Sequence, residues 1–150
     1  MSSKKLPDRY FIQAAEDIRN EGGGKFSLMG ISQKGLTSIT NDDGFILPSL
    51  AIYGMLYNLR GNFEGKIIIK DSNGEIIIEA AVPVESTEKS DPKSSKDKID
   101  SSERKLLVAG KFMNVKFKTT GKFTVSVMLD DKAFTESFRL LKPVDATSEK

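Results

Sequence analysis

The chain of 150 residues contains no cysteine, no histidine and no tryptophan. Without cysteine it can form neither a disulfide nor a thiolate zinc site, and this absence fits a reducing cytosol. Without histidine it lacks the side chain that most often transfers protons at neutral pH. These absences argue against the commonest enzymes and metal sites, so we expect no catalytic activity and no cofactor.

Long apolar runs are missing as well. The longest, residues 67–69 and 76–78, are far too short to cross a bilayer. Gln13, Glu16 and Asp17 interrupt the N-terminal segment, where a signal peptide would need an apolar stretch. We therefore expect a soluble, cytoplasmic protein that does not associate with a membrane.

An excess of charge of one sign is also absent, since 23 basic and 21 acidic residues leave a net charge of +2. Nucleic-acid binding usually requires a basic face or stripe, so nucleic acid is an unlikely partner. The segment best suited to such a role carries Lys116, Lys118 and Lys122.

What the chain does contain is alternation of apolar and polar residues between short turns. Hydrophobic residues make up 38% of it and charged residues 29%, which is typical of a globular domain, and we expect one domain over residues 8–142. Asp71-Ser-Asn-Gly74 predicts a β-hairpin, because Asn-Gly before a β-branched run suits a tight turn. The predicted strands cover residues 10–15, 25–31, 50–59, 66–70, 75–82, 105–118, 121–129 and 134–140.

Two of these segments also permit a helix. Phe11, Ala14 and Ile18 have helical spacing, and so have Ile52 and Leu56, but the strand-rich neighbours favour strands.

The stretch 32–48 is rich in turn residues, and we expect it to hold at most one short edge strand. Pro48 should lie outside the strand that follows, because proline cannot donate a hydrogen bond to a neighbouring strand.

About eight strands without a clear amphipathic helix predict an antiparallel β-sandwich, immunoglobulin-like in layout. Residues 85–104 hold one aliphatic residue besides proline and no aromatic residue, which predicts a flexible insertion loop. We expect residues 1–7 and 143–150 to be disordered tails. Glu136 shares a predicted face with Phe134 and Phe138, so it needs a sheet edge or a partner.

Residues 15–31 are followed in order by Leu47-Pro-Ser-Leu-Ala-Ile-Tyr53, Asp71-Ser-Asn-Gly74 and Gly121-Lys-Phe-Thr-Val125. This ordered set resembles a widespread family of uncharacterised bacterial proteins of about the same length. The resemblance covers residues 10–141 apart from the long loop. It implies a small β-sandwich protein without an established activity, and it carries over no functional residues.

Acidic turns offer one candidate site. They are similar in type to the loops with which C2 domains hold calcium, and a calcium site would require their oxygens to converge. Asp is also common in β-turns because it caps the local backbone, which is the reading we favour. The residues concerned are Asp42, Asp43, Asp71, Asp130 and Asp131.

Aromatic side chains offer a second candidate, since protein interfaces favour rigid aromatic anchors. We select Phe45, Phe63, Tyr53 and Tyr57 as partner-binding residues. Phe45 and Phe63 lie in turn-like sequence and are expected to be exposed.

The leading hypothesis is a non-catalytic protein-binding or assembly module. It binds another protein, or a second copy in a homo-oligomer, through free strand edges. The family resemblance further suggests an accessory component of a bacterial or phage system such as antiviral defence. The alternatives are a ligand-sensing or calcium-sensing β-sandwich domain and a virion structural subunit.

Replacing residues 86–103 by a short Gly-Ser turn should leave the melting temperature almost unchanged, because so polar a segment adds little to a core. Thermal melting followed by far-UV circular dichroism checks this expectation. A loss of the cooperative transition would show that the segment belongs to the folded domain.

Overall fold

The computed structural model describes residues 4–23, 25–31, 34–85 and 105–143. These residues form an all-β protein without helices, and hence without a helix that could span a membrane. Most of the predicted loop at 85–104 and of the predicted tail at 143–150 lies outside them. The strands are β1 (Arg9–Ala15), β2 (Asp17–Gly22), β3 (Lys25–Met29), β4 (Leu36–Thr37), β5 (Ile39–Asn41), β6 (Gly44–Tyr57), β7 (Asn62–Lys70), β8 (Ile76–Glu85), β9 (Lys105–Phe117), β10 (Gly121–Leu129) and β11 (Lys132–Leu141).

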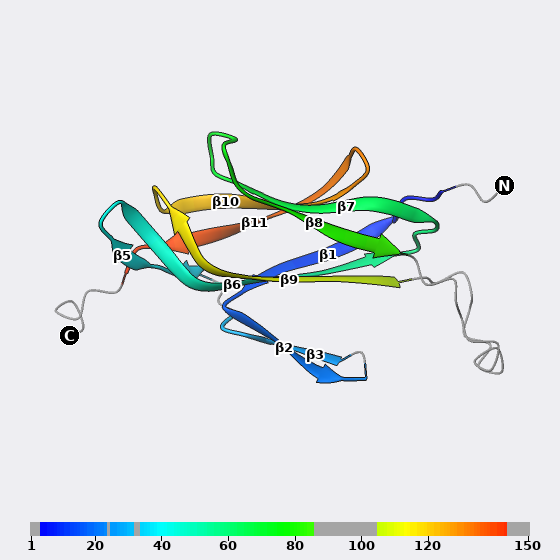
Figure 1. Cartoon of the computed structure of the whole chain (residues 1–150), viewed down its shortest axis with the longest axis horizontal. Helices are drawn as coiled ribbons and strands as arrows, with labels where there is room; N and C mark the ends of the chain where they lie inside the picture. The colour runs from blue at the N-terminus through cyan, green and yellow to red at the C-terminus, as the bar shows by residue number, and fades with distance from the viewer. Residues whose placement is uncertain (1–3, 24, 32–33, 86–104, 144–150) are drawn as a thin grey trace.

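Two sheets face each other, and a separate hairpin lies outside them (Figure 1). In the first sheet β6 is central, with β9 along one edge and both β1 and β5 along the other. The second sheet has the order β4-β11-β10-β7-β8. All pairs are antiparallel except β4 with β11, which is parallel. The arrangement agrees with the predicted β-sandwich class.

Period-two alternation explains how the sheets bury their inner faces. Along β10 the side chains of Phe123, Val125, Val127 and Leu129 are buried, while those between them are not. Alternate residues of a strand point to opposite faces, so these four enter the core. Phe123 contacts two further rings there, Phe117 at a centroid distance of 4.9 Å and Phe138 at 5.8 Å.

The predicted hairpin at Asp71-Ser-Asn-Gly74 is confirmed. The Asp71 carboxylate accepts hydrogen bonds from the backbone N–H groups of Asn73 and Glu75, both at 2.9 Å. Gly74 has φ of 84°, a conformation that glycine adopts without strain. Asp71 therefore stabilises its own turn.

The expectations for residues 32–48 were wrong. This stretch holds β4, β5 and the beginning of β6, and Pro48 lies inside β6. Proline is tolerated there because the pairing with β9 steps from Leu47 with Val115 to Ser49 with Met113 and leaves Pro48 out. Neither β1 nor β5 pairs with Pro48 on the other side.

Two further expectations concern the N-terminal segment and the edge strand β11. Residues 4–7, predicted to be disordered, instead join the fold, since Lys5 and Arg60 exchange two backbone hydrogen bonds of 2.8 Å and Pro7 is buried. Glu136 is exposed on β11, and within the described residues the one strand that pairs with β11 besides β10 is the two-residue β4 near its end. The sheet edge that Glu136 needs is therefore present.

Phe63 lies in the core and is only 7% exposed, so the expectation that it is exposed was wrong. Replacing Phe63 by alanine should lower the free energy of unfolding by about 3–5 kcal/mol, because a buried ring is lost and a cavity remains. Urea denaturation measures the change. Met113→Ala is the control, since Met113 is 61% exposed and its removal should cost about 0.5 kcal/mol or less. Equal losses in the two variants would contradict the buried position of Phe63.

Candidate protein-binding surface

The first sheet has an apolar outer face. Alternation along β6 turns Tyr53, Met55 and Tyr57 away from the core, because Ile52, Gly54 and Leu56 point into it. Strand pairing then places Phe11 of β1 on one side of Met55 and Leu107 of β9 on the other. We define the outer face by Phe11, Tyr53, Met55, Tyr57 and Leu107.

The β2–β3 hairpin lies against this side of the sheet (Figure 1). The chain leaves β1 after Ala15, and the N–H of Glu16 donates to the carbonyl of Met29 at 2.9 Å, which closes the base of the hairpin. Ala15 and Ala51 pair on the outer side of the sheet, yet both are 0% exposed. Their small side chains allow the hairpin to approach closely.

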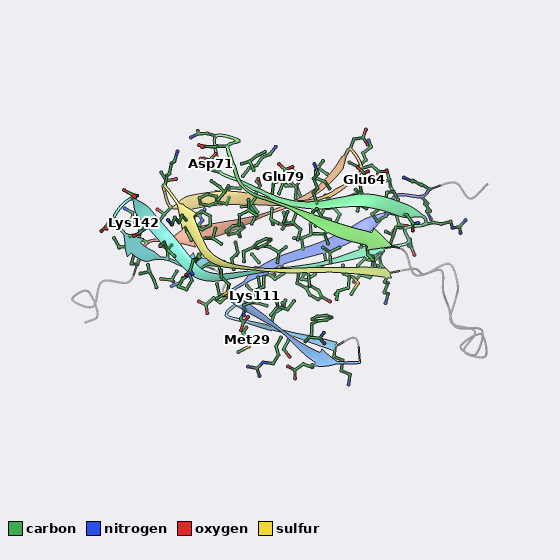
Figure 2. The ribbon with its side chains drawn as sticks, viewed as in Figure 1. Met29, Glu64, Asp71, Glu79, Lys111 and Lys142 are labelled. Atoms are coloured by element: carbon green, nitrogen blue, oxygen red, sulfur yellow. The ribbon has the colours of Figure 1, made fainter. Side chains whose placement is uncertain are left out.

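An ion pair ties the hairpin to the sheet. Lys111 of β9 lies between sheet and hairpin, and its Nζ is 2.8 Å from the Asp17 carboxylate (Figure 2). The hydrogen bond from Lys111, aided by one from the backbone N–H of Ile18, holds the pKa of Asp17 below its ordinary value. The contact thus favours the charged form of Asp17.

Tyr53 is the centre of an aromatic cluster that joins the two layers. Its ring centroid is 6.2 Å from that of Phe11 on the neighbouring strand and 6.4 Å from that of Phe26 on the hairpin. Both contacts are edge-to-face, the arrangement that aromatic pairs prefer. Phe11 remains 48% exposed, so one side of the cluster is open.

Cations border the same face at Tyr57. The Arg9 guanidinium lies 4.4 Å from the centroid of the Tyr57 ring, and the Lys105 amine lies 5.7 Å from it. Cations at such distances are attracted to the face of an aromatic ring. The apolar surface therefore ends in a positively charged rim.

The four residues selected from the sequence do not form one site. Tyr53 and Tyr57 share the outer face, whereas Phe63 is buried. Phe45 is near the opposite end of β6, roughly 40 Å from Tyr57 at the usual rise of a strand. It lines a pocket of about 340 Å³ with Ile77 and Phe117.

The sequence selection missed Phe26, Met55 and Leu107. The alternation between positions 53 and 57 was a usable signal for Met55. No local signal places Phe26 beside Tyr53, because that contact depends on how the hairpin folds back.

The acidic turns do not converge on a calcium site. The part of the chain that the structure describes contains no group of three or more carboxylates, histidines or cysteines that could hold a metal ion. Asp130 instead accepts the backbone N–H of Glu64 at 2.9 Å and the Lys4 amine at 3.1 Å, and the first of these contributes most to lowering its pKa. Asp71 and Asp130 therefore hold neighbouring backbone in place.

Acid should release the hairpin from the sheet. The folded-state pKa of Asp17 lies below the ordinary value of 3.8, so its contribution to stability is present above that pH and is lost as the pH falls through the lowered pKa. The chemical shifts of the Tyr53 ring protons, which report the nearby Phe26 ring, should therefore move at acid pH. In the Asp17→Asn variant these chemical shifts should differ from the native ones already at neutral pH, and they should no longer change at acid pH. Native shifts that stay constant while the protein remains folded would contradict the role of Asp17.

Comparison with known proteins adds no assignment to this surface. No protein-family model matches the chain, and neither a curated protein nor a solved structure is found to be similar to it.

Proposed function

We propose that the two sheets follow an immunoglobulin-like layout. In that layout the first, second, fourth and fifth of seven strands form one sheet, and the third, sixth and seventh form the other. Among the seven long strands taken in chain order, β1, β6 and β9 correspond to the first, second and fifth, and β7, β10 and β11 correspond to the third, sixth and seventh, while the fourth, β8, lies in the second sheet instead of the first. β8 extends the second sheet beyond β7, as an additional strand does in variable-type domains.

We infer that the protein is a non-catalytic module that binds another protein through its outer face. The observation that carries this inference is the contrast between the two outward sides of the sandwich. On the second sheet one outward row across β8, β7, β10 and β11 holds Glu79, Ile68, Ser126 and Thr135, and the last two share a hydrogen bond of 2.8 Å, so this row is mostly polar. On the first sheet the outward row across β1, β6 and β9 holds Phe11, Met55 and Leu107, which are all apolar.

The composition of the outer face suits a protein partner. Exposed apolar patches with a polar rim mark interaction sites, and binding energy concentrates in aromatic anchors. Phe11 and Tyr53 are such anchors, and Tyr53 is already held between two rings, which lowers the entropy lost on binding. Arg9 and Lys105 favour a partner with acidic residues around an apolar centre.

A free strand edge adjoins this face. Among the strands that the structure describes, β9 pairs only with β6, so its other edge offers backbone groups to an added strand. Lysines at 105, 111 and 116 lie along β9, and charged edge residues oppose uncontrolled pairing. A partner strand beside Leu107 would extend the apolar surface. The same edge could pair two copies in a homo-oligomer.

A role as an accessory component of a bacterial or phage system, such as antiviral defence, rests on the sequence resemblance alone. A ligand-sensing domain is the second candidate, and the pocket at Phe45 favours it. Its walls include Ile76, Ile77 and Phe117, and the ion pair between Lys118 and Glu75, at 3.7 Å, lies at its rim. The lining also includes Asn41, Asp43 and Lys116, so polar groups that orient a ligand are present beside the apolar walls.

Replacing Phe11 by glutamate should abolish partner capture and leave the melting temperature within a few degrees, because the ring is half exposed. A photo-crosslinking residue at position 11, used in a lysate of the organism that encodes the protein, identifies what contacts the face. Light scattering after size exclusion shows whether the contact is a second copy.

Ile39→Glu provides the matched control, since Ile39 is a similarly exposed apolar strand residue at the other end of the first sheet. Partner capture should survive this change. If Ile39→Glu weakens capture as much as Phe11→Glu, or if Phe11→Glu binds normally, the outer face is not the binding site.

A further inference from the structure

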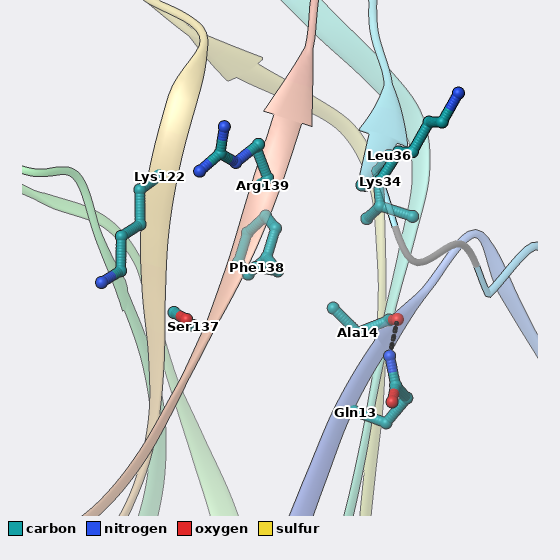
Figure 3. A pocket seen from close by; sticks show the side chains of 9 residues that line it. Gln13, Ala14, Lys34, Leu36, Lys122, Ser137, Phe138 and Arg139 are labelled. Atoms are coloured by element: carbon teal, nitrogen blue, oxygen red, sulfur yellow. Dashed lines mark hydrogen bonds between the residues drawn. The ribbon is translucent and has the colours of Figure 1, made fainter.

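The edge strands β1 and β11 face each other on one side of the sandwich and leave an opening between them. One end is closed by Tyr10, whose hydroxyl donates to the carbonyl of Thr135 at 2.8 Å and whose ring lies 5.4 Å from that of Phe134. The other end is closed by Ser38, whose N–H and hydroxyl both donate to the carbonyl of Leu141. Between these closures lies a pocket of about 340 Å³ (Figure 3).

Backbone geometry directs the amide group of Ser137 into this opening. The carbonyls of Thr135 and Leu141 both point away from β10, because each accepts a hydrogen bond from a hydroxyl on the opposite side of β11. In an antiparallel pair every second residue has this orientation, so the N–H and C=O of Ser137 point the same way. Apart from the β10–β11 pairing, the N–H, the carbonyl and the hydroxyl of Ser137 have no hydrogen bond to any residue that the structure describes.

Across the opening, a backbone carbonyl of β1 that would face a bound anion already accepts a hydrogen bond. The side-chain amide of Gln13 donates to the carbonyl of Ala14 at 2.8 Å (Figure 3). That carbonyl is therefore already hydrogen-bonded, while the Ser137 groups opposite are open to a ligand.

Positive charge gathers at the same place. Lys122 and Arg139 are directly opposite each other on β10 and β11. Like Ser126 and Thr135, they form a non-hydrogen-bonded pair of the antiparallel ladder. Side chains are closest in such pairs, so the two positive charges repel each other. Neither forms an ion pair within the described ranges, and the pocket lining, which also includes Lys34, contains no carboxylate.

The chain approaches closely enough to cover this site only because residue 35 is glycine. A Cβ atom at Gly35 would lie 2.4 Å from the carbonyl oxygen of Arg139, and the φ of 131° is one that other residues rarely adopt. Residues 34–36 can therefore lie against β11 beside Arg139.

We propose that the opening binds a small oxyanion that carries a hydroxyl group, of the class of inorganic phosphate. Arg139 and Lys122 supply the charge, and the guanidinium can donate two parallel hydrogen bonds to an oxyanion. The Ser137 N–H and hydroxyl add neutral donors, and the Ser137 carbonyl accepts from the hydroxyl of the ligand. The volume is at the small end of the range for ligand pockets, which suits a ligand of a few atoms. This site is independent of the proposed protein-binding face.

Nuclear magnetic resonance of the backbone amides tests the proposal directly. Inorganic phosphate is titrated at pH 7 and constant ionic strength, with chloride as the balancing anion. The amide signals of Ser137, Arg139 and Gly35 should shift and saturate with one site. Sulfate, which carries no hydroxyl at this pH, should bind at least fivefold more weakly. Shifts that do not saturate, or that lie elsewhere, overturn the proposal, and equal binding of sulfate overturns the assigned role of the Ser137 carbonyl.

Charge-neutral variants distinguish phosphate binding at a specific site from general electrostatic attraction. Arg139→Gln should weaken phosphate binding at least tenfold, whereas Lys132→Gln should leave it unchanged, because Lys132 is on the same strand pair but outside the pocket. Without phosphate, Arg139→Gln should melt at the same temperature as the native protein or higher, since a like-charge pair is removed. Equal weakening by the two variants would show attraction without a site and overturn the proposal.

Discussion

The register of β6 is the constraint on which both faces of the first sheet depend. This strand of 14 residues pairs with β9 along one edge and with β1 and β5 along the other. Successive side chains point to opposite faces, so one register places Ile52 and Leu56 in the core and Tyr53 and Met55 outside. A shift by one residue would exchange these sets and expose the core residues. The packing energy of the core therefore also determines which apolar side chains remain on the surface.

The outer face is built in a second step, when the β2–β3 hairpin closes over it. Two alanines make room for the hairpin, and the pair between Asp17 and Lys111 holds it in place. Phe26 then contacts Tyr53 and covers part of an apolar surface that would otherwise be larger. The hairpin leaves Phe11 open, so it both shields the sheet and delimits the region available to a partner.

β1 connects this surface with the opening on the side of the sandwich. Phe11 belongs to the outer face, while Gln13 and Ala14, two and three positions further on, line the opening. The chemistry changes over this short distance because the outer face is made by side chains of one sheet. The opening is made by the edges of two sheets, where backbone donors and acceptors are left over. Apolar contact is available at the first and charge with hydrogen bonding at the second.

Alternation and turn residues are properties of neighbouring positions, so they were enough to predict an all-β chain, the place of most strands and the hairpin at Asp71. Alternation also predicts that Tyr53 and Tyr57 share a face. The burial of Phe63, the position of Pro48 within a strand and the contact of Phe26 with Tyr53 arise only in the folded molecule. The same is true of the meeting of Lys122 and Arg139 beside the edge of β1. Each of these depends on which distant strands become neighbours, and that choice is made by the packing of the whole core rather than by any short segment.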